Sequence, residues 1–405
     1  MVRGYGPPPD FEVIIVGGGI VGLTLAGLIA QSTPLRIAII DRQVPVPGSP
    51  AEQGVQRVSA LNRASEALLQ RIGVWPTVAA SAAPYRQLLV WQAVGWGQLA
   101  ISARAVNLPQ LGHIVDNQQL RQALWQQNQQ QPTITLLAPE QVAAVVWQES
   151  LAYLTLARGA VLTTRLIIAA DGGHSWVRQQ AAIPVTFYDY PQQALVATIK
   201  TERPHQATAY QWFHEESILA LLPLVDPHHC SIVWSVPTWM ATLLTDESPG
   251  RFNHQLSAAS DRRLGDCQLV GERRCFPLTA RYAQQFAGHR IALVGDAAHT
   301  VHPVAGQGLN LGLADVALLA TELQRLPASD QAFGGYRSLR RFERQRKYEA
   351  AKLLAVTHGV QQLFAGHSPL KCWLRGAALQ AVDRLPPLKA YLVRQASGIR
   401  DNDNR

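Results

Sequence analysis

The chain contains 405 residues, of which 47% are hydrophobic and 16% are charged. This length is sufficient for two or more folded units, and the composition excludes a disordered or fibrous chain. The 36 lysines and arginines exceed the 28 aspartates and glutamates, which favours anionic ligands, but no nucleic-acid-binding module is present and we expect no nucleic-acid partner.

The first apolar stretch, residues 11–30, has nearly the length of a membrane-spanning or signal segment. Glu12 and five interspersed glycines argue against both. The four cysteines form no C-x-x-C pair or zinc spacing, as expected in a reducing cytosol. We therefore expect a soluble, cytoplasmic protein, and leave open peripheral contact with the inner membrane surface.

Four short apolar runs predict strands of one parallel sheet. They are Val13–Val16, Arg36–Ile40, Leu166–Ala170 and Ile291–Val294. Continuous rather than alternating apolarity is typical of strands that are covered on both faces. Because the runs lie far apart in the sequence, the domain that contains this sheet must be discontinuous.

Between about residues 183 and 275 the pattern changes to a period of two, which is typical of half-exposed strands in an antiparallel or mixed sheet. Cys230–Val236 alternates in this way, and Ile218–Val225 predicts a neighbouring strand. A second, sheet-based domain inserted into the first explains both patterns.

Two further segments predict helices. The glutamine-rich segment Gln118–Gln131 carries apolar residues at helical spacing, and the basic segment Tyr336–Tyr348 is also expected to be helical. A solvated face is the simpler interpretation of that charge, and contact with a membrane surface or a partner is the alternative. Apolar residues recur at helical spacing beyond Gly359, which predicts a C-terminal helical region.

The first block that carries chemistry is G-x-G-x-x-G at Gly17, Gly19 and Gly22, directly after the first predicted strand. Such glycines allow a tight turn, close approach of a pyrophosphate, and close packing of helix on strand. Asp41 follows at the end of the second strand, where a carboxylate accepts hydrogen bonds from ribose. The block predicts dinucleotide binding.

Two more blocks place a carboxylate at the end of a buried strand. Asp171 and Gly172 follow the third strand, and Gly295 and Asp296 follow the fourth, before a helix expected from about Leu309. Ligands of open α/β sheets bind at this carboxyl edge. Taken alone, Asp171 could instead cap a helix that starts near Ser175.

These three blocks, in this order, resemble the FAD-dependent aromatic hydroxylases of ubiquinone biosynthesis, which have the fold of para-hydroxybenzoate hydroxylase. The resemblance spans about residues 10–400 and includes the motifs Arg57–Ser65, Gly73–Trp75, Gly112–Asn117 and Gly295–Pro303. Three segments outside the flavin site are similar to members that hydroxylate ring carbon 5 of 2-octaprenylphenol: Ala194–Ile199, Cys230–Trp234 and Phe276–Thr279.

The resemblance implies an α/β protein in three parts. We expect a discontinuous FAD-binding Rossmann-like domain with a parallel sheet, formed by residues 1–80, 110–182 and 275–330. Residues 81–109 and 183–274 are expected to form the inserted mixed or antiparallel β-sheet domain that binds substrate. Residues 331–405 are expected to form the C-terminal helical region.

The resemblance also implies site residues. Those expected to bind FAD are Gly17, Gly19, Gly22, Asp41, Arg57, Asn117, Asp171, Gly172, Asp296, Gly308, Leu309 and Asn310. For Arg57, a surface salt bridge is the alternative. One departure lies in the turn after Gly172, where Gly173 and His174 stand in place of the expected Ala-Asn.

His299 and Pro303 are the candidates for a role in catalysis beside the flavin, although His299 could simply order its loop. The candidates for the substrate pocket are Leu219, Leu221, Pro223 and Trp234. His299 and His302 lack a third ligand of suitable spacing, so we expect no metal.

The implied activity is that of a monooxygenase that uses O₂ and a flavin C4a-hydroperoxide to hydroxylate ring carbon 5 of 2-octaprenylphenol. NAD(P)H is the expected electron donor, and a protein partner is the alternative. Three alternative functions stay open: hydroxylation at another ring position, reduction of a prenyl lipid, and a scaffold without catalysis. A homo-oligomer and a multi-enzyme quinone-biosynthesis complex stay open as assemblies.

Overall fold

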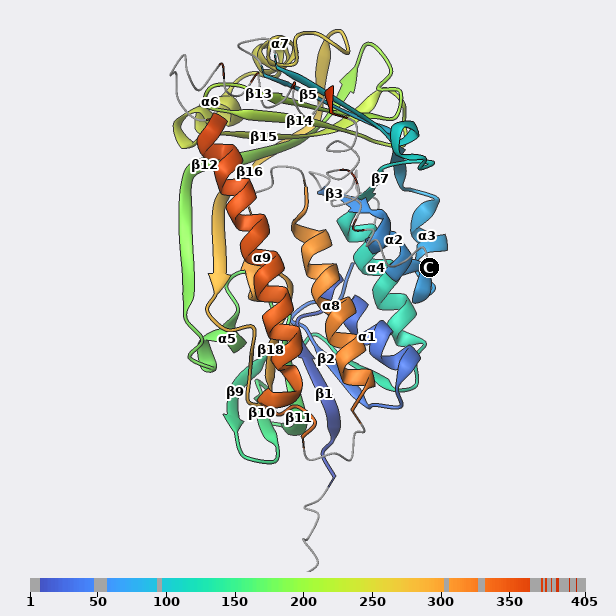
Figure 1. Cartoon of the computed structure of the whole chain (residues 1–405), viewed down its shortest axis with the longest axis vertical. Coiled ribbons are helices and arrows are strands. Elements are labelled where there is room, and N and C mark those ends of the chain that lie inside the picture. Colours follow the sequence, from blue (N-terminus) through green and yellow to red (C-terminus); the bar gives the residue numbers. More distant parts are fainter. Residues whose placement is uncertain are drawn as a thin grey trace, which may run out of the picture.

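The structure is a computed structural model that describes residues 8–46, 57–92, 97–301, 306–326 and 332–364, together with residues 373, 376, 380, 384, 385, 393 and 398. The catalytic candidate Pro303 and the neighbouring His302 lie outside the described residues. Figure 1 shows an elongated molecule with a parallel sheet at one end and a second sheet at the other.

The first sheet has the strand order β17-β18-β11-β1-β2-β8. Its strands are β1 (Phe11–Val16), β2 (Ile37–Ile40), β8 (Ile134–Leu137), β11 (Val161–Ala169), β17 (Ala287–Gly288) and β18 (Ile291–Leu293). β1 pairs in parallel with both β2 and β11, and β18 pairs in parallel with β11. The four strands predicted from apolar runs are therefore neighbours in one parallel sheet, which confirms the prediction.

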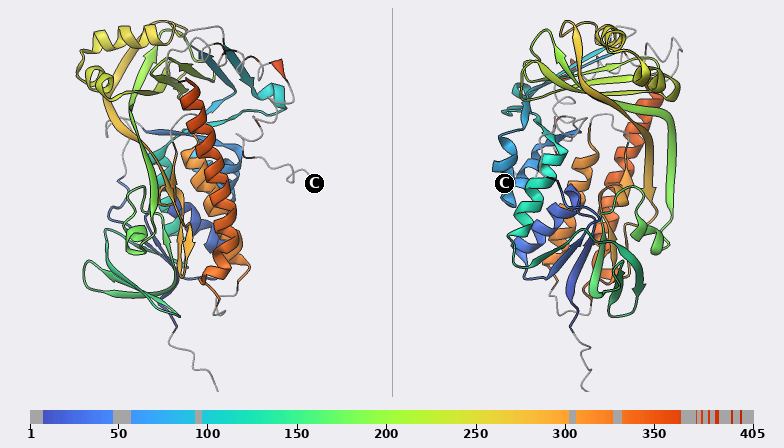
Figure 2. Two further views of the ribbon diagram at one scale, coloured as in Figure 1. Left: turned by 60° about the vertical axis from the view of Figure 1, so that its left-hand side comes forward. Right: turned by 180° about the vertical axis from the view of Figure 1, so that it is seen from behind.

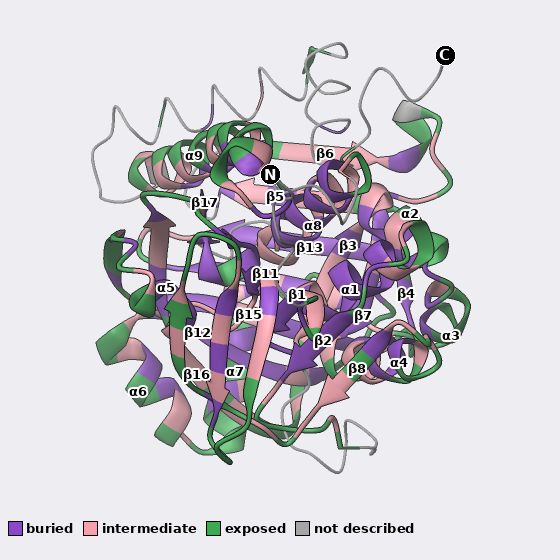
Figure 3. Cartoon of the chain, turned by 90° about the horizontal axis from the view of Figure 1, so that it is seen from below, coloured by how far each residue is buried: buried purple, intermediate pink, exposed green. Residues whose placement is uncertain are grey.

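Both faces of this sheet are covered, which explains the continuous apolarity. Helices α1 (Ile20–Ser32), α4 (Asn117–Gln129) and α8 (Gly308–Gln324) pack together on one side. On the other side, β9 (Val142–Trp147) and β10 (Ala152–Leu156) form an antiparallel meander with the start of β11, and their buried residues belong to the same core. Figure 3 shows the central strands as buried.

The second sheet has the order β19-β16-β12-β15-β14-β13-β5-β6. Its strands are β5 (Gln87–Gln92), β6 (Gln98–Ser102), β12 (Val185–Thr201), β13 (Thr208–Phe213), β14 (Ile218–Pro223), β15 (His229–Pro237), β16 (Cys267–Ala283) and β19 (His299–Thr300). All pairings are antiparallel except β13 with β5, so the sheet is mixed as expected. β14 and β15 are neighbours, as predicted. The long strand β16 runs through the expected domain boundary at 274/275.

The prediction that β15 is half exposed is wrong. Helices α6 (Thr238–Asp246) and α7 (Pro249–Ala259) cover its apolar face, on the outer side of the sheet (Figure 2). The serines of its other face, Ser231 and Ser235, are 0% and 4% exposed. That face is turned toward the FAD-binding half of the molecule, so protein rather than solvent covers the polar residues.

The remaining elements connect the two sheets. A small sheet contains β3 (Val58–Asn62), β4 (Ala83–Tyr85) and β7 (Gly112–Asp116). The other helices are α2 (Arg63–Arg71), α3 (Trp75–Ala79), α5 (Trp176–Gln180) and α9 (Tyr336–Phe364), with 3₁₀ turns η2 (Ala103–Val106) and η3 (Gly295–Ala297). The basic segment is thus helical, and one of its arginines, Arg346, is buried. In the part of the chain that the structure describes, every helix is too short or too polar to cross a bilayer.

Candidate functional site

The three predicted blocks meet at the carboxyl edge of the parallel sheet. β1 leads into Gly17, β11 into Asp171 and β18 into Gly295, and these strands are neighbours in the sheet. Their last residues are joined by backbone hydrogen bonds: Ala170 donates to Val16 (2.8 Å) and Val294 donates to Ala169 (3.0 Å). The blocks therefore form one continuous surface, as expected for a ligand site in an open α/β sheet.

The three motif glycines have different structural roles. A Cβ atom on Gly17, whose φ is +116°, would collide with the carbonyl of Ala170, and one on Gly22 would collide with the carbonyl of Gly17. A Cβ atom on Gly19 would meet nothing within 4 Å. Gly19 precedes α1, and no side chain caps this helix N-terminus. Open space beside uncapped N–H groups fits the approach of a pyrophosphate.

Asp41 lies against the first block, where the sequence predicts it. Its carboxylate accepts hydrogen bonds from the N–H groups of Gly18 (2.6 Å) and Gln43 (2.8 Å). Arg121 of α4 donates to the Gly18 carbonyl (2.7 Å) and pairs with Asp41 (3.3 Å). Sequence reasoning missed Arg121, although it lies one helical turn after Asn117 and so on the same face of α4.

Two buried oxygen atoms at this edge lack a hydrogen-bond partner among the described residues. They are Oδ1 of Asp171 and Oδ1 of Asn117. The other carboxylate oxygen of Asp171 accepts from Val177 N–H (3.1 Å), so Asp171 does assist Ser175 at the start of α5. Because buried polar atoms in folded proteins are almost always paired, the remaining oxygens fit contacts to a bound polar ligand. The ribityl hydroxyls of the FAD that the resemblance implies would provide such contacts.

Arg178 links the second and third blocks, and sequence reasoning did not assign it this role. Its buried guanidinium donates to the carbonyls of Ala297 (2.8 Å) and Gly173 (3.0 Å). Burial lowers the pKa of Arg178, and Asp171 opposes that effect. Arg178 therefore fixes the spacing of two blocks whose carboxylates are FAD candidates.

Arg57 lies beside the site. Its guanidinium is 5.1 Å from the centre of the Phe276 ring of β16, a cation–π contact, and its carbonyl accepts from Asn117 N–H (3.0 Å). Burial raises the pKa of Asp296, although water still reaches this carboxyl, and the charges of His299, Arg57 and Arg281 oppose the shift. The positive charge of Arg57 therefore favours the ionised form of Asp296.

The N-terminus of α8 lies at the position that the sequence predicts, but the side chain of Asn310 has a structural role there. Gln307 precedes Gly308 and provides no side-chain cap. The Asn310 side chain is engaged within the protein, since it accepts from Asn62 N–H (3.0 Å) and donates to the Ala60 carbonyl (2.7 Å). Contact of the flavin ring with the backbone of Gly308 and Leu309 stays a prediction.

His299 is 2% exposed and does not face an open space. Its Nε2 donates to the carboxylate of Asp315 on α8 (2.7 Å), and its ring lies 5.6 Å from that of Phe286. This arrangement orders the loop, which is one of the two readings from the sequence. A direct role in catalysis stays a prediction, as it does for Pro303 outside the described residues.

The structure contradicts the predicted substrate-pocket residues. Leu219, Leu221 and Trp234 belong to the core between the second sheet and helices α6 and α7, and are at most 2% exposed. Pro223 is buried and has the same alternation along β14 as Leu219 and Leu221. They therefore face away from the FAD-binding edge. Alternation predicts that a strand has two faces, but not which face turns to the ligand.

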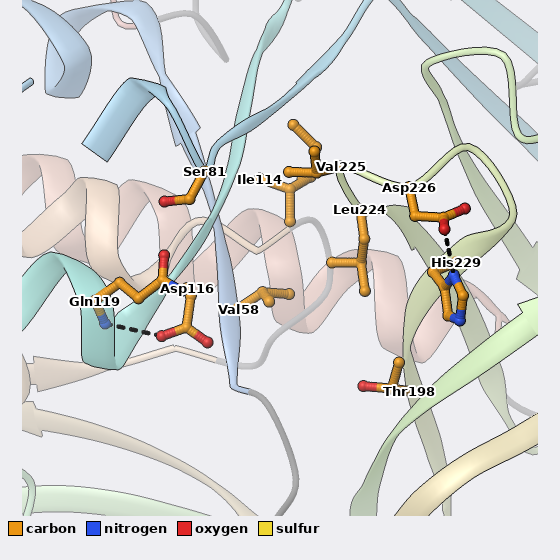
Figure 4. Close-up of a pocket in the computed structure, with 11 residues that line it drawn as sticks. Val58, Ser81, Ile114, Asp116, Gln119, Thr198, Leu224, Val225, Asp226 and His229 are labelled. Atoms are coloured by element: carbon orange, nitrogen blue, oxygen red, sulfur yellow. Dashed lines mark hydrogen bonds and ion pairs between the residues drawn. The ribbon is translucent and has the colours of Figure 1, made fainter. Parts of the chain in front are cut away.

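The opposite face of the second sheet borders a cavity of about 290 Å³. Val58, Ile114 and Asp116 of the small sheet lie across it from Thr198 of β12 and from Leu224, which follows β14 (Figure 4). Val58 and Asp116 are the chain neighbours of Arg57 and Asn117, two FAD candidates. The cavity is therefore next to the expected flavin site, and its size is near the lower end of ligand pockets, roughly 300–1,000 Å³.

The described residues contain no group of three His, Cys, Asp or Glu side chains placed to hold a metal ion. The site is thus built from backbone groups, carboxylates, arginines and an adjoining cavity with both apolar and polar walls.

Comparison with known proteins gives the family. The family described as FAD binding domain matches residues 10–355. The 3-demethoxyubiquinol 3-hydroxylase of Escherichia coli (strain K12) is 34% identical over 395 residues, which cover 96% of this chain and 98% of that protein. The chain belongs to the FAD-dependent hydroxylases of ubiquinone biosynthesis. It is accordingly a flavoprotein monooxygenase that binds FAD, and the resemblance inferred from the sequence is confirmed.

Other members and neighbours agree. Ubiquinone hydroxylase UbiL of Rhodospirillum rubrum is 34% identical and covers 96% of this chain and 89% of its own. The solved structure of PqsL, a probable FAD-dependent monooxygenase from Pseudomonas aeruginosa, has a TM-score of 0.76 at 20% identity, covering 92% of this chain and 99% of PqsL. The latter likeness shows the fold alone, and confirms the expected fold of para-hydroxybenzoate hydroxylase.

Proposed function

We propose that the protein hydroxylates the aromatic ring of a prenylated phenol in ubiquinone biosynthesis, with ring carbon 5 of 2-octaprenylphenol as the first candidate. The observation that carries the proposal is the cavity between the small sheet and the second sheet. Its walls adjoin Arg57 and Asn117, so a ring bound there would lie beside FAD. The names of the relatives, which are ubiquinone hydroxylases, support this substrate class.

The residues at the sheet edge would hold FAD. Gly19 and the start of α1 would take the pyrophosphate, Asp41 the ribose of the adenosine half, and Asp171, Asn117 and Asp296 the polar groups between them and the ring. Bound FAD supplies the electrons and the activation of O₂ that ring hydroxylation requires. NAD(P)H as electron donor and O₂ as co-substrate belong to the proposal.

The protein's own contributions would be electrostatic and steric. The uncapped N-terminus of α8 presents a partial positive charge, which favours negative charge at the Gly308–Asn310 segment. The second sheet would close over the ring and limit access of water, which is needed because reactive oxygen species otherwise decay without product. Thr198 and Leu224, which line the cavity on the side of the second sheet, replace the earlier candidates for the wall.

Hydroxylation at a ring position other than carbon 5 is an alternative. The relative in Escherichia coli is named for hydroxylation at carbon 3 of a different substrate. Prenyl-lipid reduction and a scaffold role stay as alternatives. Peripheral membrane contact and assembly with copies or other enzymes also stay predictions.

Product analysis under ¹⁸O₂ tests the proposal. Purified protein reconstituted with FAD is given a reductant and either 2-octaprenylphenol or 3-demethoxyubiquinol, with parallel reactions that lack substrate. We expect one ¹⁸O atom in the ring, and its position identifies the carbon. Substrate binding and flavin oxidation without a labelled product from either compound would refute the proposal and favour a reductase or a scaffold.

A further inference from the structure

A buried carboxylate on α8 joins three segments of the chain around the third flavin block. Asp315 is 0% exposed, and its two partners with charged or ionisable side chains, His299 and Arg346, are each 2% exposed. His299 follows the third block, and Arg346 belongs to the basic segment of α9. Arg346 has no role in the site described above, and for His299 the contacts described there order its loop.

One oxygen atom of Asp315 contacts the chain on both sides of Asp296. Oδ2 accepts from the N–H group of Gly295 (2.9 Å) and from Nε2 of His299 (2.7 Å). Asp296 lies between these two points, within the single turn η3. The position of its backbone is therefore set from both sides by a single side chain.

The other oxygen atom of Asp315 connects the block to α9. Oδ1 accepts from Nε of Arg346 (2.6 Å), and the same guanidinium donates to the carbonyl of Leu311 (3.1 Å). Leu311 lies in the first turn of α8, which begins at Gly308. The network thus also fixes the end of α8 that faces the flavin site.

Such a network is a costly means of holding a loop. Transfer of several charged groups out of water has a large desolvation cost, and buried apolar residues of similar volume often give equal or greater stability. A fully hydrogen-bonded polar network specifies one arrangement of its parts more sharply than apolar packing does. Its position beside Asp296 and the start of α8 suggests that geometry, rather than stability, is its purpose.

We propose that His299, Asp315 and Arg346 are positioning residues that present Asp296 and the N-terminus of α8 to FAD. The proposal rests on the proposed function for the identity of the cofactor, although it does not depend on the substrate. Loss of the network should therefore lower the affinity for FAD by a larger free energy than it lowers the stability of the apoprotein.

The chain contains a matched control on the same two helices. Glu322 lies two turns after Asp315 on α8, and it pairs with Arg325 (2.8 Å) and with Arg341 of α9 (3.5 Å). Like Asp315 it connects α8 to a basic residue of α9, but its recorded contacts do not include the third block. If the ion pairs between α8 and α9 only stabilised the fold, loss of either carboxylate's ion pairs would have the same kind of effect.

The test compares the full-length variants His299→Gln, His299→Leu and Glu322→Gln. A glutamine amide can donate to Asp315, whereas leucine cannot. FAD affinity is measured on the apoprotein by flavin fluorescence, with the absorption spectrum of the bound flavin and the Tm of the apoprotein. We expect the Kd for FAD to rise at least tenfold in His299→Leu, and to stay within threefold of wild type in the other two.

Arg346→Lys is a second variant, which keeps the positive charge but cannot bridge Asp315 and Leu311. It should raise the Kd severalfold with a nearly unchanged Tm, and it serves if His299→Leu does not fold. Unchanged FAD affinity in His299→Leu or in Arg346→Lys, with a Tm lowered as in Glu322→Gln, would overturn the inference. Wild-type protein that binds FAD but yields no hydroxylated ring would count against the proposed function alone, because the inference concerns only how the variants change FAD affinity.

Discussion

Substitution of alanine at each glycine of the G-x-G-x-x-G motif should separate folding from cofactor binding. At Gly22 a Cβ atom would meet the carbonyl of Gly17, and at Gly17 it would meet that of Ala170 with φ at +116°. Overpacking of this kind costs about 1–3 kcal/mol. At roughly 2.1 cal/mol/K per residue, the unfolding entropy of this chain is about 0.85 kcal/mol/K, so a cooperative apoprotein loses about 1–4 °C in Tm.

Gly19→Ala should have the opposite effect. Gly19 has φ −81° and ψ 178°, which alanine adopts freely, and its Cβ atom would meet nothing within 4 Å. Replacement of glycine by alanine, in a conformation that alanine can adopt, stabilises a protein by about 0.4–1 kcal/mol because it reduces the conformational entropy of the unfolded chain. The apoprotein should therefore be as stable as wild type or slightly more so. FAD affinity should fall at least tenfold, about 1.4 kcal/mol, because the methyl group stands where the pyrophosphate would approach.

Thermal unfolding of the apoproteins and FAD titration of each variant measure both effects. Gly19→Ala with normal FAD affinity would refute the assignment of that space to the pyrophosphate. A loss of Tm in Gly19→Ala as large as that in Gly22→Ala would refute the steric reasoning.

Three further predictions follow from the site. Arg121→Ala should raise the Kd for FAD severalfold in fluorescence titrations, because Asp41 and the Gly18 carbonyl lose a shared partner, while this partly exposed pair contributes about 1 kcal/mol or less to stability. Leu221→Ala should lower the free energy of unfolding by about 2–5 kcal/mol in denaturant titrations and leave KM nearly unchanged. Leu222→Ala, on the opposite face of β14, should mainly change KM. The reverse result would contradict the assignment of the two faces. Burial alone would raise the pKa of Asp315, but His299 and Arg346 outweigh it and hold the pKa below the usual 3.8. The stability advantage of wild type over Asp315→Asn should therefore persist above pH 4 and shrink as the pH falls below 3.8, and an advantage that grows on acidification would refute this.

The local chemistry of the flavin site could be predicted from the sequence because each block is contiguous. A buried strand, a turn of glycines and a carboxylate at the strand end follow one another within a few residues at Gly17, Asp171 and Gly295. Their burial on both faces is visible as continuous apolarity. The parallel sheet, and the meeting of the three blocks at its edge, follow from those patterns and from the rule that ligands bind at this edge.

The residues that sequence reasoning missed act over long separations. Arg121 reaches Gly18 from 103 positions away, and Arg178 reaches Ala297 from 119 positions away. Arg178 has no local pattern that distinguishes it from a solvated arginine, and Arg121 is marked only by its spacing of one helical turn from Asn117. The same holds for Arg346. It is one of several basic residues in one helix, and only the tertiary structure shows that its side chain is turned toward Asp315 and buried.

The sequence by itself thus determined the class of fold, the cofactor and the three blocks that meet at the edge of the parallel sheet. Only the tertiary structure decided which face of the second sheet turns to the flavin, and it reversed the expectation for Leu219, Leu221 and Trp234. The physical reason is that alternation records that one face of a strand is apolar. Packing alone decides whether that face is buried under helices α6 and α7 or forms the wall of a pocket.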